Sequence, residues 1–466
     1  MISLTLSTIA SAVDGQLLGE DLTINNITID SRTLQPNDLF LALKGVKFDG
    51  HKFITKAEKT GCSALIVDHQ VESNLPQIIV KDTHKALGLI SAYVKHTLAP
   101  KTVAITGSSG KTTVKEMVSA ILSRIGNVLA TQGNFNNDIG VPLTLLRLEP
   151  SHDFAIVELG ANHMGEIEYT TNLVQPDVAV INNIAAAHLE GFGNLCGVAR
   201  AKGEIFEGLP ENGVALYNQD CKFANKWQWR LENKTVRRFS CVSESDCFSS
   251  TVVLDDRGCA SFTLNTHVGN TFIELTVPGK HNVCNAVAAA IIAIEFGASL
   301  NDIRIGLAEM APVDGRLNIH QLTPELRLID DTYNANVESI KAATDLLASY
   351  PGKRILILGD MGELGSEARS YHQEVGEYAQ TCRIEHLLTV GVLSQATTDA
   401  FNQKNNTQTS LHFSSKEALV NALHPLIENE EQQISILIKG SRSAHMEDVV
   451  KQVITQYQQK NNEGIA

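Results

Sequence analysis

The sequence predicts an α/β protein built from three domains. Its 466 residues amount to about three domains of roughly 150 residues each. Short apolar runs, typical of buried strands, alternate with segments of helical length over much of the chain, and this alternation predicts largely parallel sheets covered by helices. One apolar run leads directly into a glycine-containing loop and a helix, which is an arrangement that binds phosphate groups.

Residues 1–83 are expected to form a small mixed α/β domain. The opening stretch, MISLTLSTIASAVDGQLLGED, has no basic leader, no continuous apolar core and no convincing cleavage site. It is therefore interpreted as a first strand and helix rather than as a signal peptide. ALIVD at 64–68 is a further strand candidate in this domain.

Residues 84–311 are expected to form a central P-loop domain with a parallel sheet, as in ATPases. Apolar residues run together at 101–106, 154–159 and 177–184, and each run predicts a buried strand. Helix-length segments separate these strands, so the sheet is expected to be largely parallel and covered by helices.

Residues 312–466 are expected to form a C-terminal, Rossmann-like doubly wound domain. Its strand candidates are LRLID, RILILG, HLLTV and ISILIKG, again separated by segments of helical length. Ligands of such folds bind at the carboxyl ends of the strands, so polar residues that follow these strands are candidates for binding.

Composition and charge narrow the classes of function. A net charge of −14 argues against nucleic acid as the main substrate. No apolar run approaches the roughly 20 residues of a membrane-spanning helix, so the protein is expected to be cytoplasmic, without a membrane span. The eight cysteines include no C-x-x-C pair, which favours reduced thiols over a disulfide framework or a zinc site.

The loop GSSGKTT, at 107–113, follows the apolar run KTVAIT. Gly107 and Gly110 allow backbone amides to turn toward an anion, Lys111 can neutralise phosphate charge, and Thr112 can offer its hydroxyl to magnesium. The longer standard pattern requires glycine where this chain has Ile105, so we interpret the loop as a short variant. A plain turn between a strand and a helix is the alternative.

Several long segments carry a resemblance. They are QGNFNNDIGVPLTLL, ELGANHMGEI, NNIAAAHLEGFG, ARAKGEIF, GKHNVCNA, DGRLN, DDTYNAN, LGDMGELG and KGSRS, which lie between residues 132 and 443. Together with the short loop they resemble the Mur ligase family, the ATP-dependent amide-forming enzymes of peptidoglycan precursor synthesis, and within it the D-alanyl-D-alanine-adding branch.

The resemblance implies an ATP-dependent ligase. It would join UDP-N-acetylmuramoyl-tripeptide to D-alanyl-D-alanine through an acyl phosphate and release ADP and phosphate, with no nucleic-acid partner. A monomer is expected. The weaker readings are the amino-acid-adding tripeptide synthetase of the family, folylpolyglutamate synthase and a nucleotide-sensing module without ligation. The tripeptide synthetase has a D-N-P-R-type signature that is absent here, and folylpolyglutamate synthase leaves the N-terminal segment unexplained.

The resemblance also implies two magnesium sites. Taken alone, Glu158 at the end of an apolar strand is most often an ion-paired or solvated group, His188 a hydrogen-bonded core histidine and Lys202 a surface lysine. In the family the matching lysine is carbamoylated, which converts its ammonium into an anionic ligand. The implied magnesium ligands are Thr112, Glu158, His188 and Lys202, and the implied catalytic residues are Lys111, Lys202, His188 and Glu158.

Binding roles follow from the same resemblance. ATP contacts are implied for Thr106, Gly107, Ser108, Ser109, Gly110, Lys111, Thr112, Thr113, His281, Asn282, Asn285, Arg316 and Asp331. Substrate contacts are implied for Ser31, Arg32, Lys44, Gly45, Asp49, Gly50, His51, Asn134, Asn136, Asn137, Asn334 and Asn336. Helix capping, surface ion pairs, a polar turn and a hairpin are the ordinary roles of these residue types.

Overall fold

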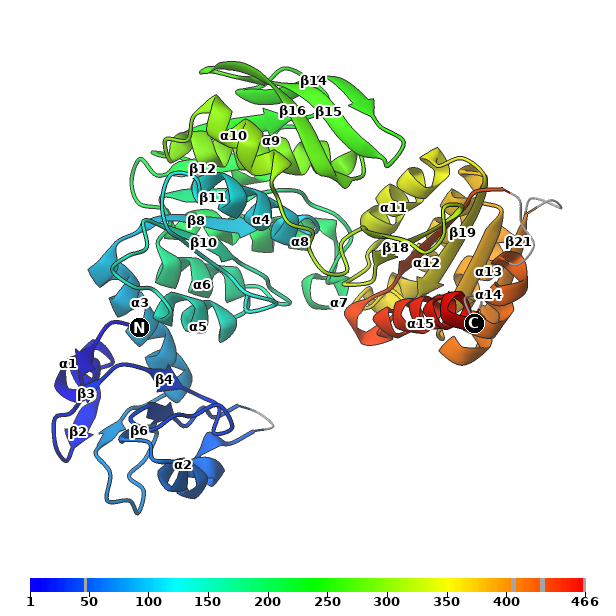
Figure 1. The fold of residues 1–466 in the computed structure, drawn as a ribbon. Coiled ribbons are helices and arrows are strands. Elements are labelled where there is room, and N and C mark those ends of the chain that lie inside the picture. The colour runs from blue at the N-terminus through cyan, green and yellow to red at the C-terminus, as the bar shows by residue number, and fades with distance from the viewer. Residues whose placement is uncertain (46–47, 404–407, 428–431, 464–466) are drawn as a thin grey trace.

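The computed structural model describes residues 1–45, 48–403, 408–427 and 432–463. Three main sheets of five, nine and six strands follow one another along the chain, and each forms its own body with the helices packed on it (Figure 1). The predicted α/β fold class is confirmed. The domain boundaries near 83 and 312 stay predictions, although strands of the three sheets occupy separate stretches of the sequence, 16–79, 101–278 and 318–439.

The N-terminal part is mixed, as expected. Its elements are β1 Leu4–Thr5, α1 Leu6–Ala12, β2 Gln16–Leu18, β3 Thr23–Ile24, β4 Ile27–Thr28, β5 Leu39–Leu41, η1 Gly50–Phe53, α2 Ile54–Thr60, β6 Ala64–Val67 and β7 Gln77–Ile79. The sheet order is β2-β7-β6-β5-β4, with only β2 antiparallel, and β1 pairs with β3 separately. The predicted first strand and helix and the strand in 64–68 are therefore present.

Helix α3, Thr83–Leu98, connects the N-terminal and central sheets. Its buried residues, which include Leu87, Ile90 and Val94, form one face, and the helix lies against α5 and α6 of the central part. Near its start the His84 ring nitrogen Nε2 lies 2.9 Å from the Asp138 carboxylate. This pair fastens the helix to the loop that precedes α5.

We expect the His84–Asp138 pair to make stability depend on pH. Its hydrogen bond raises the pKa of His84 above 6.5 and lowers the pKa of Asp138 below 3.8. The histidine contribution is complete below pH 6.5 and is lost as pH rises through the raised pKa, whereas the aspartate contribution is lost as pH falls through the lowered one. Thermal unfolding should therefore show a larger deficit for His84→Gln at about pH 5.5 than at about pH 9. An equal deficit at both pH values would contradict this assignment.

The central sheet has the strand order β16-β15-β14-β13-β12-β11-β8-β10-β9. Its first elements are β8 Lys101–Thr106, α4 Lys111–Leu122, β9 Val128–Ala130, α5 Gly140–Leu146, β10 Phe154–Glu158, α6 Glu166–Val174, β11 Val178–Ile181, α7 Leu189–Phe192, α8 Leu195–Gly203 and η2 Glu204–Gly208. Strands β8, β10 and β11 are the three predicted from apolar runs. Such runs mark them because helices cover both faces of a parallel sheet, so nearly all side chains of these strands are buried.

The rest of the central part contains a feature that the sequence analysis did not predict. Its elements are β12 Val214–Asn218, η3 Ala224–Arg230, β13 Thr235–Ser240, β14 Cys247–Leu254, β15 Cys259–Thr266, β16 Gly269–Pro278, α9 His281–Glu295 and α10 Leu300–Ala308. The strands from β9 to β14 pair in parallel, and β14, β15 and β16 pair antiparallel at one edge. Exposed and buried residues mix along these three strands. The strands therefore lack the continuous apolar runs from which the other strands were predicted.

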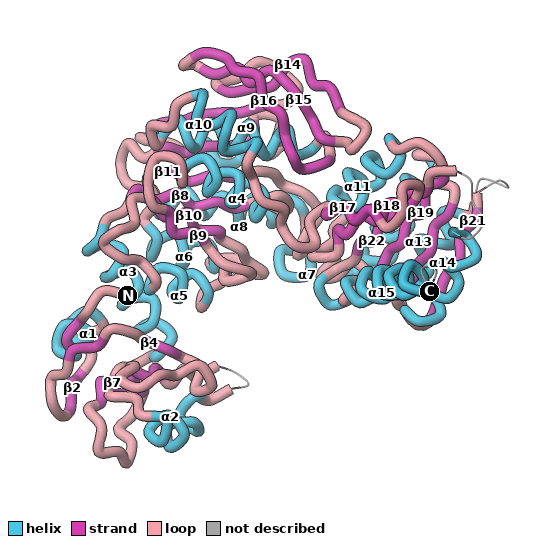
Figure 2. Tube along the Cα trace, in the orientation of Figure 1, coloured by secondary structure: helices cyan, strands magenta, loops and turns pink. Residues whose placement is uncertain are grey.

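The C-terminal part is the predicted doubly wound domain. Its elements are β17 Asn318–Gln321, β18 Leu326–Asp331, α11 Val337–Ser349, β19 Lys353–Gly359, η4 Gly365–Glu367, α12 Ala368–Thr381, β20 His386–Val390, α13 Gln395–Phe401, β21 Thr409–Phe413, α14 Lys416–Ile427, β22 Ile434–Lys439, η5 Arg442–Ala444 and α15 Glu447–Glu463. The order is β17-β18-β22-β19-β20-β21, and only β17 is antiparallel. Helices surround this sheet (Figure 2). No helix within the described residues is long and apolar enough to cross a membrane.

Candidate active site

The glycine-containing loop joins β8 to α4, as predicted. Ile105 is fully buried within β8, so the loop is the short variant. Gly110 precedes α4 with a φ of 75°, a backbone conformation that glycine adopts at little cost. A Cβ atom at Gly110 would lie 2.6 Å from the Asn285 side-chain oxygen. Glycine is therefore required here both by the backbone and by the close packing of α9.

Two asparagines that the sequence analysis did not single out brace this loop. Asn183 accepts a hydrogen bond from the Ser109 backbone amide at 2.9 Å, and Asn182 donates one to the Ser109 carbonyl at 3.1 Å. Ser108 adds a bond from its hydroxyl to the Ala185 carbonyl at 3.0 Å. The predicted strand at 177–184 included both asparagines, but β11 ends at residue 181. A polar pair at the carboxyl end of a parallel strand is the signal that could have identified them.

Glu158 lies at the centre of a polar cluster beside the loop. One of its carboxylate oxygens accepts a hydrogen bond from the Thr112 hydroxyl at 3.0 Å, and the other accepts one from the Asn136 amide at 2.8 Å. Lys111 bends back over the loop and donates to the Gly107 carbonyl at 2.9 Å. Burial lowers the pKa of Lys111, while the charge of Glu158 acts in the opposite direction. The cluster combines two oxygen donors with a cation at the start of a helix.

The structure does not place Lys202 on the surface, where a lysine on a helix is usually found. The residue lies in the last turn of α8 and is 1% exposed. Burial lowers its pKa well below the ordinary 10.5, and the neighbouring charge of Lys111 lowers it further. The charge of Glu158 acts in the opposite direction. A lowered pKa increases the fraction of neutral amine, which is the form that can react with carbon dioxide.

His188 is not the hydrogen-bonded core histidine that is the ordinary role of this residue type. It precedes α7 with a φ of 53°, and its Nδ1 lies 2.5 Å from the Glu363 carboxylate of the C-terminal part. Contact with His188 lowers the pKa of Glu363. The pair links the central part to the loop between β19 and η4, and a metal role for His188 would use its other ring nitrogen.

A cavity of about 710 Å³ adjoins the loop on the side of α9. Among its lining residues are Ser109, Gly110, Thr113, His281, Asn282, Asn285, Arg316 and Asp331. All eight were implied as ATP contacts, and the structure brings them together from the central and C-terminal parts. Lys111, Thr112, Glu158 and Lys202 do not line this cavity. The cavity therefore lies against one side of the loop.

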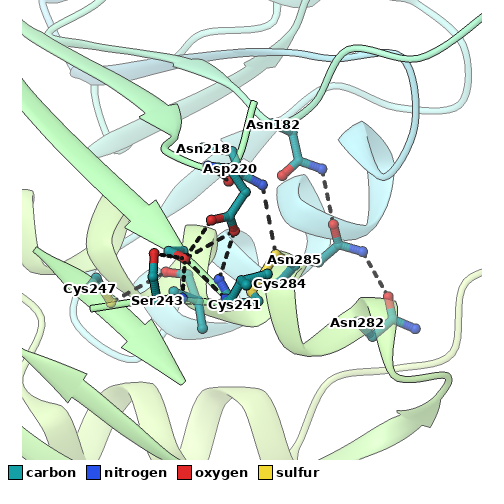
Figure 3. The surroundings of a disulfide bond; sticks show 12 residues. Asn182, Asn218, Asp220, Cys241, Ser243, Cys247, Asn282, Cys284 and Asn285 are labelled. Atoms are coloured by element: carbon teal, nitrogen blue, oxygen red, sulfur yellow. Dashed lines mark hydrogen bonds between the residues drawn. A yellow bond between two sulfur atoms is a disulfide. The ribbon is translucent and has the colours of Figure 1, made fainter. Parts of the chain in front are cut away.

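An amide chain forms one wall of the cavity. Asn182 donates to Asn285 at 3.0 Å, and Asn285 donates to Asn282 at 2.8 Å (Figure 3). Asn282 in turn donates to the Pro278 carbonyl at 2.7 Å. Asn282 and Asn285 lie within α9 and make no capping bond at its start, so the ordinary role considered for them is not the one observed. Burial also lowers the pKa of His281, which favours a neutral imidazole in this wall.

The expectation of reduced thiols is wrong for one pair of cysteines. Cys241, directly after β13, and Cys284, in α9, form a disulfide with a Cα separation of 5.6 Å (Figure 3). Cys284 lines the cavity. The fold brings the two residues together across 43 positions of sequence, and spacing alone gives no sign of such a pairing. The other six cysteines are free: Cys62, Cys196, Cys221, Cys247, Cys259 and Cys382.

Arg316 reaches from the junction of the two parts toward the loop. One of its terminal nitrogens lies 3.5 Å from the Thr112 hydroxyl, and the guanidinium covers the Tyr333 ring at 4.3 Å. Within the described part of the chain, its Nε atom is buried without a hydrogen-bond partner. Buried donors of this kind are rare and call for a ligand. An anion between the loop and Arg316 would satisfy it.

Asp331 forms a buried ion pair rather than a surface one. The Lys439 ammonium, at the end of the adjacent strand β22, donates to the Asp331 carboxylate at 2.6 Å and to the Asn334 carbonyl at 2.8 Å. Asn336 caps α11 through Ser339 and donates to the Ser108 carbonyl at 3.4 Å. The lysine thus fixes the loop after β18, which reaches the phosphate loop.

Breaking this pair should destabilise the protein. Asp331→Ala leaves the ammonium of Lys439 buried without its partner, which is expected to lower the free energy of unfolding by about 3–5 kcal/mol. Replacing both residues, in Asp331→Ala/Lys439→Met, should restore much of that loss because no isolated charge remains. Chemical denaturation of the parent and both variants measures this. A single variant as stable as the double variant would refute the assignment of a buried charge pair.

The implied substrate residues fall in two places. Asn136 reaches Glu158, while Asn134 and Asn137 form the turn before α5, where Asn137 accepts from the Gly140 amide at 2.8 Å. Ser31, Arg32, Lys44, Gly45, Asp49, Gly50 and His51 lie in the N-terminal part, and none of them lines the 710 Å³ cavity. Arg32 pairs with Asp30 at 2.7 Å. These residues form a separate group from the loop cluster.

Models of three Mur ligase domains match this chain. They are the Mur ligase family catalytic domain at residues 23–95, the middle domain at 105–293 and the glutamate ligase domain at 315–442. The chain belongs to the Mur ligase family. The matches span all three sheets, so the family assignment covers the N-terminal, central and C-terminal parts.

Individual Mur ligases are similar to this chain over nearly its whole length. The UDP-N-acetylmuramoyl-tripeptide--D-alanyl-D-alanine ligase of Escherichia coli (strain K12) is 49% identical over 451 residues, covering 97% of this chain and 98% of that protein. The ligase of the same name from Bacillus subtilis (strain 168) is 34% identical, with 97% and 99% covered. The crystal structure of MurF from Acinetobacter baumannii is 37% identical, with a TM-score of 0.93 and 98% and 99% covered.

Proposed function

We propose that this Mur ligase adds D-alanyl-D-alanine to UDP-N-acetylmuramoyl-tripeptide at the expense of ATP. The observation that carries the proposal is the meeting of Lys111, Thr112 and Glu158 beside a cavity that spans the central and C-terminal parts. The substrates follow from the near full-length relatives that bear this enzyme's name. A diaminopimelate-adding ligase and a folylpolyglutamate synthase also resemble this chain in structure, but they are only 18% and 16% identical to it. The buried Lys202 favours ligation over a sensing module.

The proposed reaction proceeds through an acyl phosphate. A carboxylate does not acylate an amine unaided, so the terminal carboxylate of the tripeptide first attacks the γ-phosphorus of ATP and ADP departs. The amine of D-alanyl-D-alanine then attacks the acyl carbon, and phosphate leaves as the amide forms. The first step brings two anions together, so catalysis depends on fixed positive groups around them.

The geometry supports a distinct role for each part of the site. The backbone amides of residues 107–113 and the Lys111 ammonium face the β- and γ-phosphates, as at other helix N-termini. The unpartnered Nε of Arg316 offers a further donor to the same anion. The cavity wall of Asn282, Asn285 and His281 is proposed for the base and ribose, and Asp331 for ribose hydroxyls.

The donor set fits magnesium at the loop cluster. The Thr112 hydroxyl and the Glu158 carboxylate adjoin each other, and oxygen atoms are the ligands that Mg²⁺ prefers. Lys202 is proposed as a further ligand in its carbamate form, and His188 as a fourth. When bound, Mg²⁺ neutralises charge as the γ-phosphoryl group transfers. Glu158 holds Thr112 and Asn136 in place for this arrangement.

The proposed function places the protein in the cytoplasm, where its soluble nucleotide substrate would be made. The residues proposed to hold the uridine nucleotide are Ser31, Arg32, Lys44, Gly45, Asp49, Gly50 and His51. Because these residues lie in the N-terminal part, a substrate bound there would have to extend to the loop cluster to be phosphorylated. A monomer is proposed as the working unit.

An omission assay tests the proposed function. Purified protein is given ATP and magnesium with both, either or neither of UDP-N-acetylmuramoyl-tripeptide and D-alanyl-D-alanine, and ADP release is followed. Sustained release should require both substrates. Tripeptides with diaminopimelate or lysine at the third position are tested in parallel to identify the preferred one. Release that is independent of the dipeptide would overturn the proposal.

A further inference from the structure

Two histidines and an aspartate converge in the N-terminal part, far along the chain from the loop cluster. His51 is the second residue of the short helix η1, and Asp68 and His69 directly follow β6. One ligand atom from each of the three lies within 4.8 Å of those of the others. The two imidazole rings stack with centroids 4.8 Å apart, and one nitrogen of each ring lies beside the Asp68 carboxylate.

The His51 ring has an orientation that its neighbours fix. Its Nδ1 lies 2.7 Å from the Asp49 carboxylate, which requires the proton on Nδ1. In neutral His51 the other nitrogen, Nε2, then carries a lone pair, and it accepts a hydrogen bond from the Asp68 amide at 3.2 Å. The same Nε2 lies only 3.1 Å from an oxygen of Asp68. A cation shared by these two atoms, either a proton or a metal ion, would make the close approach favourable.

The two oxygens of the Asp68 carboxylate contact different kinds of partner. One oxygen, Oδ2, pairs with the Lys44 ammonium at 3.0 Å, while Oδ1 meets both His51 Nε2 and His69 Nδ1. Oδ2 is thus occupied by the lysine, and Oδ1 faces the two rings.

We propose that His51 Nε2, Asp68 Oδ1 and His69 Nδ1 form a binding site for a late first-row divalent cation such as Zn²⁺. Two imidazoles and a carboxylate suit such ions better than they suit Mg²⁺. Bonds of about 2.0–2.1 Å at tetrahedral angles place ligand atoms about 3.3 Å apart, close to the 3.1 Å between His51 and Asp68. Water or an anionic oxygen completes the coordination.

Asp49 strengthens the inference. A histidine that binds a metal through one ring nitrogen characteristically donates the other ring N–H to a carboxylate, which orients the ring and raises its basicity. The bond between His51 and Asp49 is of this type. The His51 side chain is only 8% exposed. Its surroundings and the bond to Asp49 therefore fix the ring orientation before any ion binds.

Direct metal binding tests the site without any ligase assay. Protein stripped with a chelator is dialysed against Zn²⁺ in buffer free of magnesium and nucleotide, and bound zinc is measured. The parent should take up zinc stoichiometrically, and His69→Ala should lose that uptake. His267→Ala, which removes another exposed histidine at the turn between β15 and β16, should retain it. Circular dichroism confirms that each variant is folded.

Asp49→Asn provides a second, milder variant. Loss of the carboxylate that orients His51 should raise the dissociation constant for zinc by about 10- to 100-fold without abolishing binding. Equal zinc uptake by the parent and His69→Ala, or an equal loss in His267→Ala, would overturn the proposal and leave the group as hydrogen-bonded side chains only. An unchanged dissociation constant in Asp49→Asn would also contradict it.

Discussion

Lys202→Ala is expected to lower ligase turnover by about 100- to 1,000-fold, the range seen when one group that stabilises developing charge is removed. Lys202 is 1% exposed and its pKa is held well below the ordinary value by burial and by Lys111. Such an amine is poised to become a carbamate, and the proposed reaction needs an anionic ligand beside the transferred phosphate. ATP binding should fall much less than turnover, because the phosphate loop remains.

Matched variants separate the carbamate role from packing. Lys202→Met keeps most of the buried volume and should be as inactive as Lys202→Ala, whereas a packing role would leave it active. Lys202→Arg should also be inactive, because a guanidinium keeps its charge and does not accept carbon dioxide in this way. Added acetate or formate should partly restore Lys202→Ala. Turnover is compared at fixed ionic strength and saturating magnesium, and parent-like activity of Lys202→Arg would refute the role.

Lys111→Ala is expected to raise the activation free energy of the ligase reaction by several kcal/mol without unfolding the protein. The substitution removes a cation that contacts the backbone of the phosphate loop, where its ammonium lies 2.9 Å from the Gly107 carbonyl. Lys101→Ala is the control, since this exposed lysine begins the same strand and should have no effect on turnover.

Phosphate release and thermal unfolding are measured for both lysine variants. Carboxylates should give no rescue of Lys111→Ala, because the missing group there is a cation. Near-parent turnover in folded Lys111→Ala would remove the basis for assigning residues 107–113 to phosphate binding.

The strands and the loop could be predicted because their signals are local. Strands β8, β10 and β22 are largely apolar runs, since their side chains are buried on both faces of the sheet. The loop between β8 and α4 combines glycines, a lysine and threonines in the order that a phosphate site needs. These features require no knowledge of distant parts of the chain.

The remaining features depend on contacts between distant residues. From the sequence alone, Lys202 is expected to be an ordinary surface lysine on a helix. Only the packing of α8 in the structure shows that it is buried. The Asp331–Lys439 pair joins the ends of two strands that are neighbours in the sheet but not in the sequence. Cys241 and Cys284 meet for a similar reason. The family resemblance identified Lys202 and Asp331 as important without indicating these environments.

Isotope transfer from substrate to phosphate tests the acyl-phosphate ligase most directly. UDP-N-acetylmuramoyl-tripeptide is labelled with ¹⁸O in its terminal carboxylate and incubated with ATP, magnesium and D-alanyl-D-alanine, and the released phosphate is examined by mass spectrometry. If the carboxylate attacks the γ-phosphorus, each phosphate released with amide formation carries one oxygen from the labelled carboxylate. Phosphate without label, in a reaction that consumes both substrates, would contradict the proposed chemistry.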